Sequence, residues 1–233
     1  MRVCLLSYQI NHRKTFDVLT GLKAKGYKDV CVYLIPLQYK KKFTPLFEHR
    51  PSCSCTLYEN LDYKKVIQNF GYEYKLINSY LDIKENDSVV WLVCGAGLLP
   101  ASFYKNNIVI NSHPGFIPFV RGLDSLKWAI VEEKTIGVTS HFIGDYVDAG
   151  DIICREEVPV YQNDTFHAVS ERVYHSEIRL LVNAVENHEV LFSTNGEDYV
   201  VHKRMPHEIE SHLLEKFENW KKDFLNRDER VKV

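Results

Sequence analysis

The segment Asn111-Ser112-His113-Pro114-Gly115-Phe116-Ile117-Pro118 directly follows the apolar pair Val109-Ile110, which predicts a strand that leads into a polar motif. Further along the chain, Thr139-Ser140-His141-Phe142 ends a second predicted strand, and Val147-Asp148-Ala149-Gly150-Asp151 follows it. In open α/β sheets, the carboxyl ends of the strands form the crevice where ligands bind. The position of these polar residues therefore favours a functional site over a purely structural role.

Together these segments contain one amide, two imidazoles and one carboxylate, from Asn111, His113, His141 and Asp148. Such a set suits chemistry at a carbonyl carbon, because an amide and a protonatable ring can hold a developing oxyanion while a carboxylate transfers protons. The residues alone also allow structural roles. Asn111 could cap a turn, His113 could be a buried core imidazole, and Asp148 could begin an Asx turn.

The first half of the chain alternates β-branched runs with helical stretches, which predicts an α/β fold with a Rossmann-like, mostly parallel twisted sheet flanked by helices. The predicted strands cover residues 2–6, 29–35, 88–93, 109–110, 137–142 and 152–158. The predicted helices cover 15–25 and 61–70, each followed by a glycine, and 165–187, with Asn163-Asp164 as its N-cap. We expect a catalytic domain over 1–200 and a C-terminal helical extension over 201–233.

Composition and charge restrict the classes of function. The 233 residues include 29 Lys plus Arg against 31 Asp plus Glu, so the net charge is −2 and no nucleic-acid partner is expected. No apolar run approaches the length of a membrane span or a signal-peptide core. The six cysteines lie mostly in apolar runs, where a free thiol behaves as a small hydrophobe, and this predicts a reduced cytoplasm as the location.

Residues 37–59 lack clear periodicity and are expected to form a long loop. Lys40-Lys41-Lys42 within this segment is predicted to be a solvated face, because three adjacent side chains do not converge on one anion. Cys53-Ser54-Cys55 has neither a nearby histidine nor a second cysteine pair, so no metal site is expected.

Two predicted helices have an apolar stripe. In 165–187 the stripe includes Glu177, whose buried charge requires either a basic partner such as Arg172 or Arg179, or a polar pocket. The tail over 208–224 is predicted to be one amphipathic helix, and its apolar face is formed by Ile209, Leu213, Phe217, Trp220 and Phe224. This helix either packs back on its own domain or forms a subunit contact, as in a homodimer.

Between residues 88 and 187 the chain resembles the formyltransferases that use 10-formyltetrahydrofolate, including glycinamide ribonucleotide formyltransferase, methionyl-tRNA formyltransferase and the sugar N-formyltransferases. The resemblance rests on 111–118 with Arg121-Gly122, and on 137–142 with 147–153. It implies the formyltransferase fold and assigns the catalytic places to Asn111, His113 and Asp148. His141 would support Asp148 or orient a bound water.

The resemblance also implies a reaction in which a substrate amine attacks the formyl carbon of 10-formyltetrahydrofolate. The Asn111 amide and the His113 ring would hydrogen-bond the negative oxygen of the tetrahedral intermediate. Asp148 would accept the proton of the amine and return it to the departing folate nitrogen. Because an ordinary histidine titrates near neutral pH, the Asp148 charge would also decide whether His113 donates as imidazolium or imidazole.

By the same resemblance, two strand-end segments would bind the folate with their backbone, and a third group of residues would bind the acceptor. The folate residues are Cys94, Gly95, Ala96, Gly97, Leu98 and Leu99 in the first segment and Ile143, Gly144 and Asp145 in the second. The acceptor residues are Gly115, Arg121, Gly122 and Glu177.

Departures within the family favour a sugar N-formyltransferase of surface polysaccharide biosynthesis, such as that of the lipopolysaccharide O-antigen. Its acceptor would be an amino-deoxy sugar linked to a nucleoside diphosphate. The purine enzymes have a glycine-rich phosphate loop after the first strand, because backbone amides need glycine to wrap a phosphate closely. Residues 7–13 occupy this position here and contain no glycine, which disfavours the purine enzyme. Arg121-Gly122 is similar to the tRNA and sugar branches, and 201–233 leaves no room for the C-terminal β-barrel of the tRNA branch.

Two alternatives belong to other classes of function. One is phosphoribosylglycinamide formyltransferase of purine synthesis, with an unusual phosphate site. The other is a regulatory protein on the same fold that binds folate without transferring a formyl group, because a fold does not imply an activity.

Overall fold

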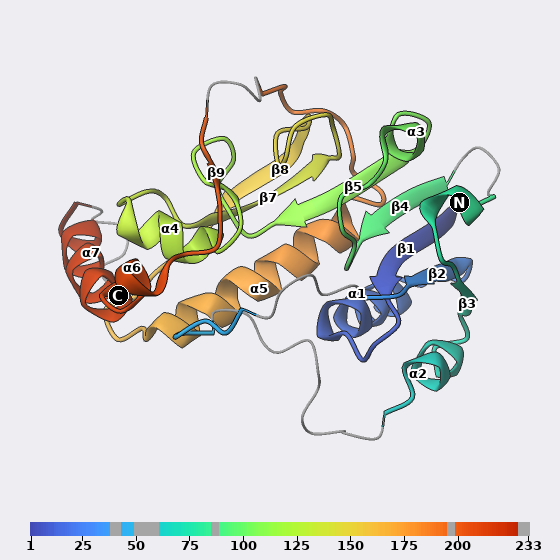
Figure 1. Cartoon of the computed structure of the whole chain (residues 1–233), viewed down its shortest axis with the longest axis horizontal. Helices are drawn as coiled ribbons and strands as arrows, with labels where there is room; N and C mark the ends of the chain where they lie inside the picture. Colours follow the sequence, from blue (N-terminus) through green and yellow to red (C-terminus); the bar gives the residue numbers. More distant parts are fainter. Residues whose placement is uncertain (38–42, 49–60, 85–88, 195–198, 228–233) are drawn as a thin grey trace.

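The computed structural model describes residues 1–37, 43–48, 61–84, 89–194 and 199–227, with side chains described as far as residue 222 (Figure 1). The lysine run 40–42 and the cysteine pair 53–55 therefore lie outside the described residues, as does most of the predicted loop 37–59.

A seven-stranded sheet with the order β3-β2-β1-β4-β5-β7-β8 forms the centre of the molecule. Its strands are β1 (Arg2–Tyr8), β2 (Val30–Ile35), β3 (Glu73–Leu76), β4 (Val89–Val93), β5 (Ile108–His113), β7 (Gly137–Phe142) and β8 (Ile152–Glu157). The strands from β3 to β5 run parallel, whereas β7 is antiparallel to both of its neighbours. The predicted α/β fold with a mostly parallel sheet is confirmed.

Two strands differ from the prediction. β3, at the edge of the sheet, was not predicted, because its sequence Glu-Tyr-Lys-Leu has no apolar run and most of its side chains are exposed. β5 is longer than the predicted strand and includes Asn111, Ser112 and His113. The polar motif is therefore part of the strand itself, which gives its side chains the alternating directions of a β-strand.

The predicted helices are present with shifted ends. They are α1 (Arg13–Ala24), α2 (Tyr63–Asn69) and α5 (Phe166–Asn183). The predicted N-cap of α5 was wrong, because Thr165 caps the helix by accepting a hydrogen bond from the Ala168 N–H at 3.2 Å. Asp164 instead accepts from the Tyr161 N–H and pairs with Arg172. Shorter helices not predicted from the sequence are η2 (Tyr80–Asp82), α3 (Ala101–Tyr104) and α4 (Ser125–Val131).

Helices lie on both faces of the sheet (Figure 1), and apolar clusters fill the space between them and the strands. α1 and α5 pack on one face, around buried side chains that include Leu5, Leu19 and Leu181. α3 and η2 lie on the opposite face, where Trp91 contacts Phe103. Because residues alternate along each strand, neighbouring residues of β5 point into different clusters.

The C-terminal extension contains two helices where one was predicted. α6 (His207–Glu210) and α7 (Leu213–Arg227) are separated at Ser211-His212. Leu213, Phe217 and Trp220 of α7 are buried in one cluster with Leu126 and Ile130 of α4, so α7 packs on its own chain. A subunit contact through the other faces of the extension stays a prediction. The Phe224 side chain lies outside the described residues.

Two further contacts join the extension to the rest of the chain. β9 (Val201–His202) pairs in parallel with β6 (Arg121–Gly122) to form a second, two-stranded sheet. Glu210 of α6 forms a fully buried ion pair with Lys127 of α4 and accepts hydrogen bonds from the backbone of Leu46 and Phe47. The extension is therefore attached beside the strand that carries Arg121.

No helix in the described part of the chain has the length and apolar character needed to cross a membrane. Cys4, Cys31 and Cys94 are buried, and Cys154 is half-buried. Burial raises the pKa of Cys94 to about 12, so this thiol is neutral at physiological pH.

Candidate active site

The polar residues of the two sequence motifs meet around the C-terminal half of β5. In the antiparallel pairing of β5 with β7, Asn111 lies opposite His141 and His113 lies opposite Thr139. Because alternate residues of a strand share a face, Asn111 and His113 point to one side, together with His141. Asp148 reaches the same place from the loop between β7 and β8, with a left-handed backbone at φ 47°.

The distances within this group are short. His113 Nδ1 lies 3.4 Å from Asp148 Oδ2, and His141 Nε2 lies 3.7 Å from Asp148 Oδ1. Asn111 Nδ2 lies 3.5 Å from His141 Nε2. One carboxylate thus faces both imidazoles, and one imidazole faces the amide, as the chemistry of an oxyanion and a transferred proton requires.

Asp148 is ionised at neutral pH. Burial raises the pKa of Asp148. The His113 and His141 rings, the Gly122 N–H and the Arg121 guanidinium lower it by more in total, so the pKa of Asp148 lies below its ordinary value. The Gly122 N–H donates to Asp148 Oδ2 at 3.0 Å. The carboxylate is therefore held as an acceptor for a proton.

His141 is held as a neutral ring that orients Asn111. Burial lowers the pKa of His141, and the opposing charge of Asp148 does not outweigh this effect. Its Nδ1–H donates to Phe142 O at 2.9 Å, which leaves the Nε2 lone pair to accept from Asn111 Nδ2. An amide nitrogen carries two hydrogens, so the second N–H of Asn111 can bind an oxyanion.

His113 is buried on the side away from Asp148 by α4 and the chain that precedes it. His113 Nε2 lies 3.1 Å from Ser125 Oγ and 3.3 Å from Val120 O. A Cβ atom at Gly115 would lie 2.6 Å from both His113 Nε2 and Val120 O, so only glycine leaves room for the ring. No sequence pattern singled out Ser125, because a serine in the first turn of a helix is an ordinary feature.

Arg121 and Gly122 are built into the support of Asp148. Arg121 Nε and Nη2 donate to Val147 O at 2.9 and 2.6 Å, and Nη1 donates to Tyr199 O at 3.3 Å. Burial lowers the pKa of Arg121, against the raising effect of Asp148. Of the predicted acceptor residues, Arg121 therefore contacts the backbone beside Asp148 and Gly122 donates to the Asp148 carboxylate itself, while Gly115 lies against the His113 ring.

Glu177 has a different partner from those predicted. Glu177 Oε1 lies 2.7 Å from Lys14 Nζ, and its side chain is 1% exposed. A basic partner was predicted and is confirmed, but the two arginines named as examples are not it, because Arg172 pairs with Asp164 and Arg179 pairs with Glu156. Lys14 is 163 residues from Glu177 in the chain, so helical periodicity in α5 could not indicate it.

The two predicted folate segments lie beside each other on the face of the sheet that carries α3. Ala96, Leu99 and Ile143 pack against the same apolar cluster, and the Ile143 N–H donates to Val109 O at 2.9 Å. Leu98 is 87% exposed, and a Cβ atom at Gly97 would meet nothing within 4 Å. Leu98 is thus an exposed apolar side chain beside accessible backbone at Gly97.

Two members of the folate segments have other contacts. Asp145 pairs with Lys105 and accepts from the Tyr104 hydroxyl at 2.8 Å, and the Lys105 and Tyr104 hydrogen bonds lower its pKa. Cys94 belongs to the buried cluster beneath α1 and α5, on the other face of the sheet. The Cys94 side chain therefore contributes to the core, while its backbone continues toward the open segment.

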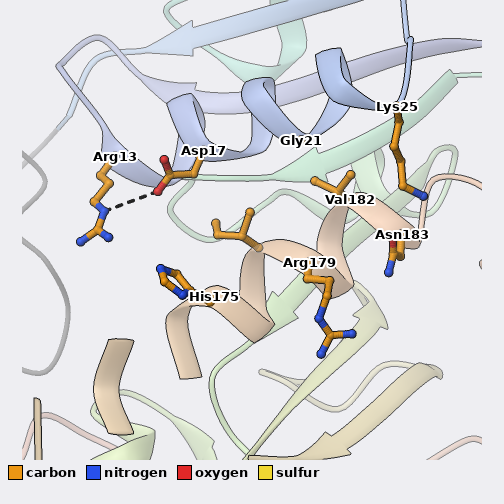
Figure 2. Close-up of a pocket in the computed structure, with 9 residues that line it drawn as sticks. Arg13, Asp17, Gly21, Lys25, His175, Arg179, Val182 and Asn183 are labelled. Carbon is orange, nitrogen blue, oxygen red and sulfur yellow. Dashed lines mark ion pairs between the residues drawn. The ribbon is translucent and has the colours of Figure 1, made fainter. Parts of the chain in front are cut away.

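A groove of about 460 Å³ lies elsewhere, between α1 and α5 (Figure 2). Arg13, Asp17 and Gly21 line it from α1, and the facing residues of α5 include His175 and Arg179. Its charged groups are already paired, since Arg13 contacts Asp17 and Glu171 and Arg179 contacts Glu156. Within the described ranges, no group of three or more His, Cys, Asp or Glu side chains is arranged to hold a metal ion.

Comparison with known proteins gives the family of the fold and site. Residues 60–185 match the family described as Formyl transferase. The trifunctional purine biosynthetic protein adenosine-3 of Homo sapiens is 33% identical over 115 residues, which cover 47% of this chain and 11% of that protein. The chain thus spans about a tenth of the length of that relative.

Solved structures from two branches share the fold. An N-formyltransferase from Helicobacter canadensis, in complex with folinic acid and dTDP-3-aminofucose, superposes with a TM-score of 0.61 at 16% identity, over 93% of this chain and 80% of that one. A phosphoribosylglycinamide formyltransferase from Anaplasma phagocytophilum superposes with a TM-score of 0.58 at 16% identity, over 86% and 98%. At these identities, the likeness extends to the fold alone.

Proposed function

Because the chain belongs to the formyl transferase family, we propose that it transfers a formyl group from 10-formyltetrahydrofolate to the amine of a nucleotide-linked amino-deoxy sugar. The observation that carries formyl transfer is the meeting of Asn111, His113, His141 and Asp148 on one face of β5 and β7. Each group has the partner that its role requires.

The chemistry follows from the arrangement of these side chains. Attack of an amine on a formyl carbon places negative charge on the formyl oxygen, which the free N–H of Asn111 and the positive charge of a protonated His113 stabilise. The attacking nitrogen must also lose a proton. Asp148, with its lowered pKa, is present as the carboxylate that accepts this proton, directly or through a water molecule.

The formyl donor is supported by the open segments beside this group. The Gly95 N–H already donates to Leu6 O at 3.0 Å, so the backbone from Ala96 to Leu98 and the loop after β7 would hold the ring of 10-formyltetrahydrofolate, and the bound donor supplies the formyl group. Asn111 lies on β5, between β4 and β7, from which these segments emerge. This order of strands supports a donor site in which Asn111 lies between the two proposed walls.

The sugar acceptor is supported by the loop that follows β1. Ser7 Oγ and His12 Nδ1 both contact Thr15 Oγ1, at 2.5 and 2.9 Å, so side chains fill the start of α1. A phosphate cradle at a helix start would instead need glycine and open backbone amides. The N-formyltransferase from Helicobacter canadensis, which shares the fold, was solved with a nucleotide-linked amino sugar.

The alternative acceptor is glycinamide ribonucleotide. It is favoured by the 33% identity with the trifunctional purine biosynthetic protein over 115 residues. Glu177 does not distinguish the two acceptors, because its carboxylate is buried and pairs with Lys14.

A panel of acceptors tests the proposal. Purified protein is incubated with 10-formyltetrahydrofolate and with dTDP- or UDP-linked 3-amino and 4-amino deoxysugars, and formylated products are detected by mass spectrometry. The same nucleotide sugars with a hydroxyl in place of the amine serve as controls and should not react. Turnover of glycinamide ribonucleotide, without turnover of any amino sugar, would overturn the sugar assignment.

A further inference from the structure

A closed ring of contacts joins His113, Asp148, Ser125 and Gly122. The Gly122 N–H donates to Asp148 Oδ2 at 3.0 Å, and this oxygen lies 3.4 Å from His113 Nδ1. On the other side of the imidazole, His113 Nε2 lies 3.1 Å from Ser125 Oγ, and the Ser125 hydroxyl donates to Gly122 O at 3.0 Å. The ring therefore begins and ends on the two backbone groups of a single residue.

These backbone groups determine the direction of every hydrogen bond in the ring. A backbone N–H can only donate and a backbone carbonyl can only accept. The single hydroxyl hydrogen of Ser125 is used on Gly122 O, so Ser125 Oγ accepts from His113 Nε2. The Asp148 carboxylate has no hydrogen and lies 3.4 Å from His113 Nδ1, so this contact favours a hydrogen on Nδ1. Both nitrogens of the His113 ring therefore face acceptors, which is the arrangement that suits an imidazolium.

A neutral His113 would leave buried groups unsatisfied. With its hydrogen on Nδ1, the ring would require the Ser125 hydroxyl to turn away from Gly122 O, and the Nε2 lone pair would face Val120 O at 3.3 Å. With its hydrogen on Nε2, the ring would present a lone pair to Asp148. Unpaired buried acceptors are costly, so each neutral form is disfavoured relative to the charged one.

We propose that Ser125 is a positioning residue that keeps the His113 ring protonated beside the oxyanion site. Ser125 is buried and acts through its contacts with His113 and Gly122. This inference rests on the proposed formyl transfer, in which a charged ring stabilises the negative formyl oxygen next to the Asn111 amide. It does not depend on which amine accepts the formyl group.

The other charged groups around the ring come from the elements packed against it. Asp148, from the loop after β7, favours the proton on His113, whereas the Arg121 guanidinium of β6 and the Lys14 ammonium beneath β5 oppose it. His141 of β7 is neutral, since burial lowers its pKa. Ser125 adds a neutral acceptor that binds only the protonated Nε2, and it does so from a fully buried position.

Two variants of matched shape isolate the hydroxyl. Ser125→Thr retains it and Ser125→Val replaces it with a methyl group, while both side chains are β-branched and place the same strain on the first turn of α4. Ser170→Ala is the control, because Ser170 is buried in α5 and its hydroxyl has no hydrogen-bond partner among the described residues.

The first measurement follows the His113 imidazole nitrogens by NMR across pH in the unliganded protein, with the signal assigned by its loss in His113→Gln. In Ser125→Val the ring should lose its proton at lower pH than in Ser125→Thr or Ser170→Ala. Equal titration of His113 in the Thr and Val variants would overturn the proposal, even if Val lowered the melting temperature. This readout needs no acceptor, so it stands whether or not the sugar assignment is correct.

The second measurement is formyl transfer, with whichever amine the acceptor panel identifies. We expect kcat of Ser125→Val to fall roughly 10- to 100-fold, as for the loss of one hydrogen bond to a charged group, with KM little changed. The high-pH limit of its activity should also move to lower pH, and Ser125→Thr should recover the rate. An unchanged kcat and pH profile in a folded Val variant would contradict the proposal.

Discussion

Lys14 Nζ lies 2.7 Å from Glu177 Oε1, in an ion pair that joins the first turn of α1 to the middle of α5. The same ammonium donates to Ser112 O at 3.4 Å. Ser112 lies between Asn111 and His113, whose side chains point to the opposite face of the sheet. The pair therefore braces β5, the strand of the candidate active site, from the opposite face of the sheet. Neither residue needs a contact with substrate for its loss to affect the site.

Glu177→Gln should destabilise the fold by about 3 to 5 kcal/mol, because it leaves the Lys14 charge buried without its partner. Denaturant unfolding followed by circular dichroism measures this change. Arg179→Ala is the matched control: its guanidinium is 54% exposed, and breaking its pair with Glu156 should cost less than about 1 kcal/mol. Similar costs for the two variants would contradict the bracing role.

Asp148→Asn should lower kcat by roughly 100- to 10,000-fold, because an amide cannot accept the proton of the attacking amine. Binding of folate, measured by calorimetry, should persist. Asp29→Asn provides the control, since this exposed carboxylate pairs with Arg2 rather than with the imidazoles and belongs to neither proposed binding site. A wild-type rate in Asp148→Asn would show that another group transfers the proton.

The stability of the protein should decrease on mild acidification in a way that depends on His141. The pKa of His141 is lowered by burial, so the unfolded chain binds a proton below about pH 6.5 while the folded protein does not. Stability is therefore complete above this pH and is lost as pH falls toward the folded pKa. His141→Gln should flatten the dependence in this window, whereas the exposed His175→Gln should leave it unchanged.

Asp148 should make the stability depend on pH in a second, more acidic range. Its pKa is also lowered, so its contribution is present above the unfolded value of about 3.9 and is lost as pH falls through the folded value. Wild type and Asp148→Asn should consequently differ most in stability at neutral pH and converge in strong acid. Unfolding curves from pH 7 to pH 2 measure this convergence, and a constant difference would refute the assigned direction.

Gly122→Ala should destabilise the protein by about 2 kcal/mol or more and also lower activity. The residue has a left-handed backbone at φ 88°, and an added Cβ atom would lie 2.2 Å from His202 O. The strand pair β6–β9 would have to separate, and the Gly122 N–H would move from Asp148. Gly97→Ala, whose Cβ would meet nothing within 4 Å, should keep the wild-type melting temperature.

The motifs and the fold class could be predicted from the sequence because both depend on local order. Apolar runs and glycines marked most strands and helices, and Asn111, His113, His141 and Asp148 each follow or end such a run. Antiparallel pairing of β5 with β7 then makes their meeting a consequence of strand register. β3 was missed because a polar edge strand has no apolar pattern, and the tail was wrongly predicted as one helix because amphipathic spacing continues across Ser211-His212.

The partners of these residues were decided only by the tertiary structure. Glu177 could be recognised as a buried charge, but its cation lies in α1, and two nearer arginines were equally plausible in sequence. Ser125 contacts His113, and Gly122 contacts Asp148, because the packed chain brings α4 and β6 beside these residues. A repeating pattern records which side of an element is apolar, whereas a hydrogen bond depends on the positions of two atoms that only the packed chain brings together.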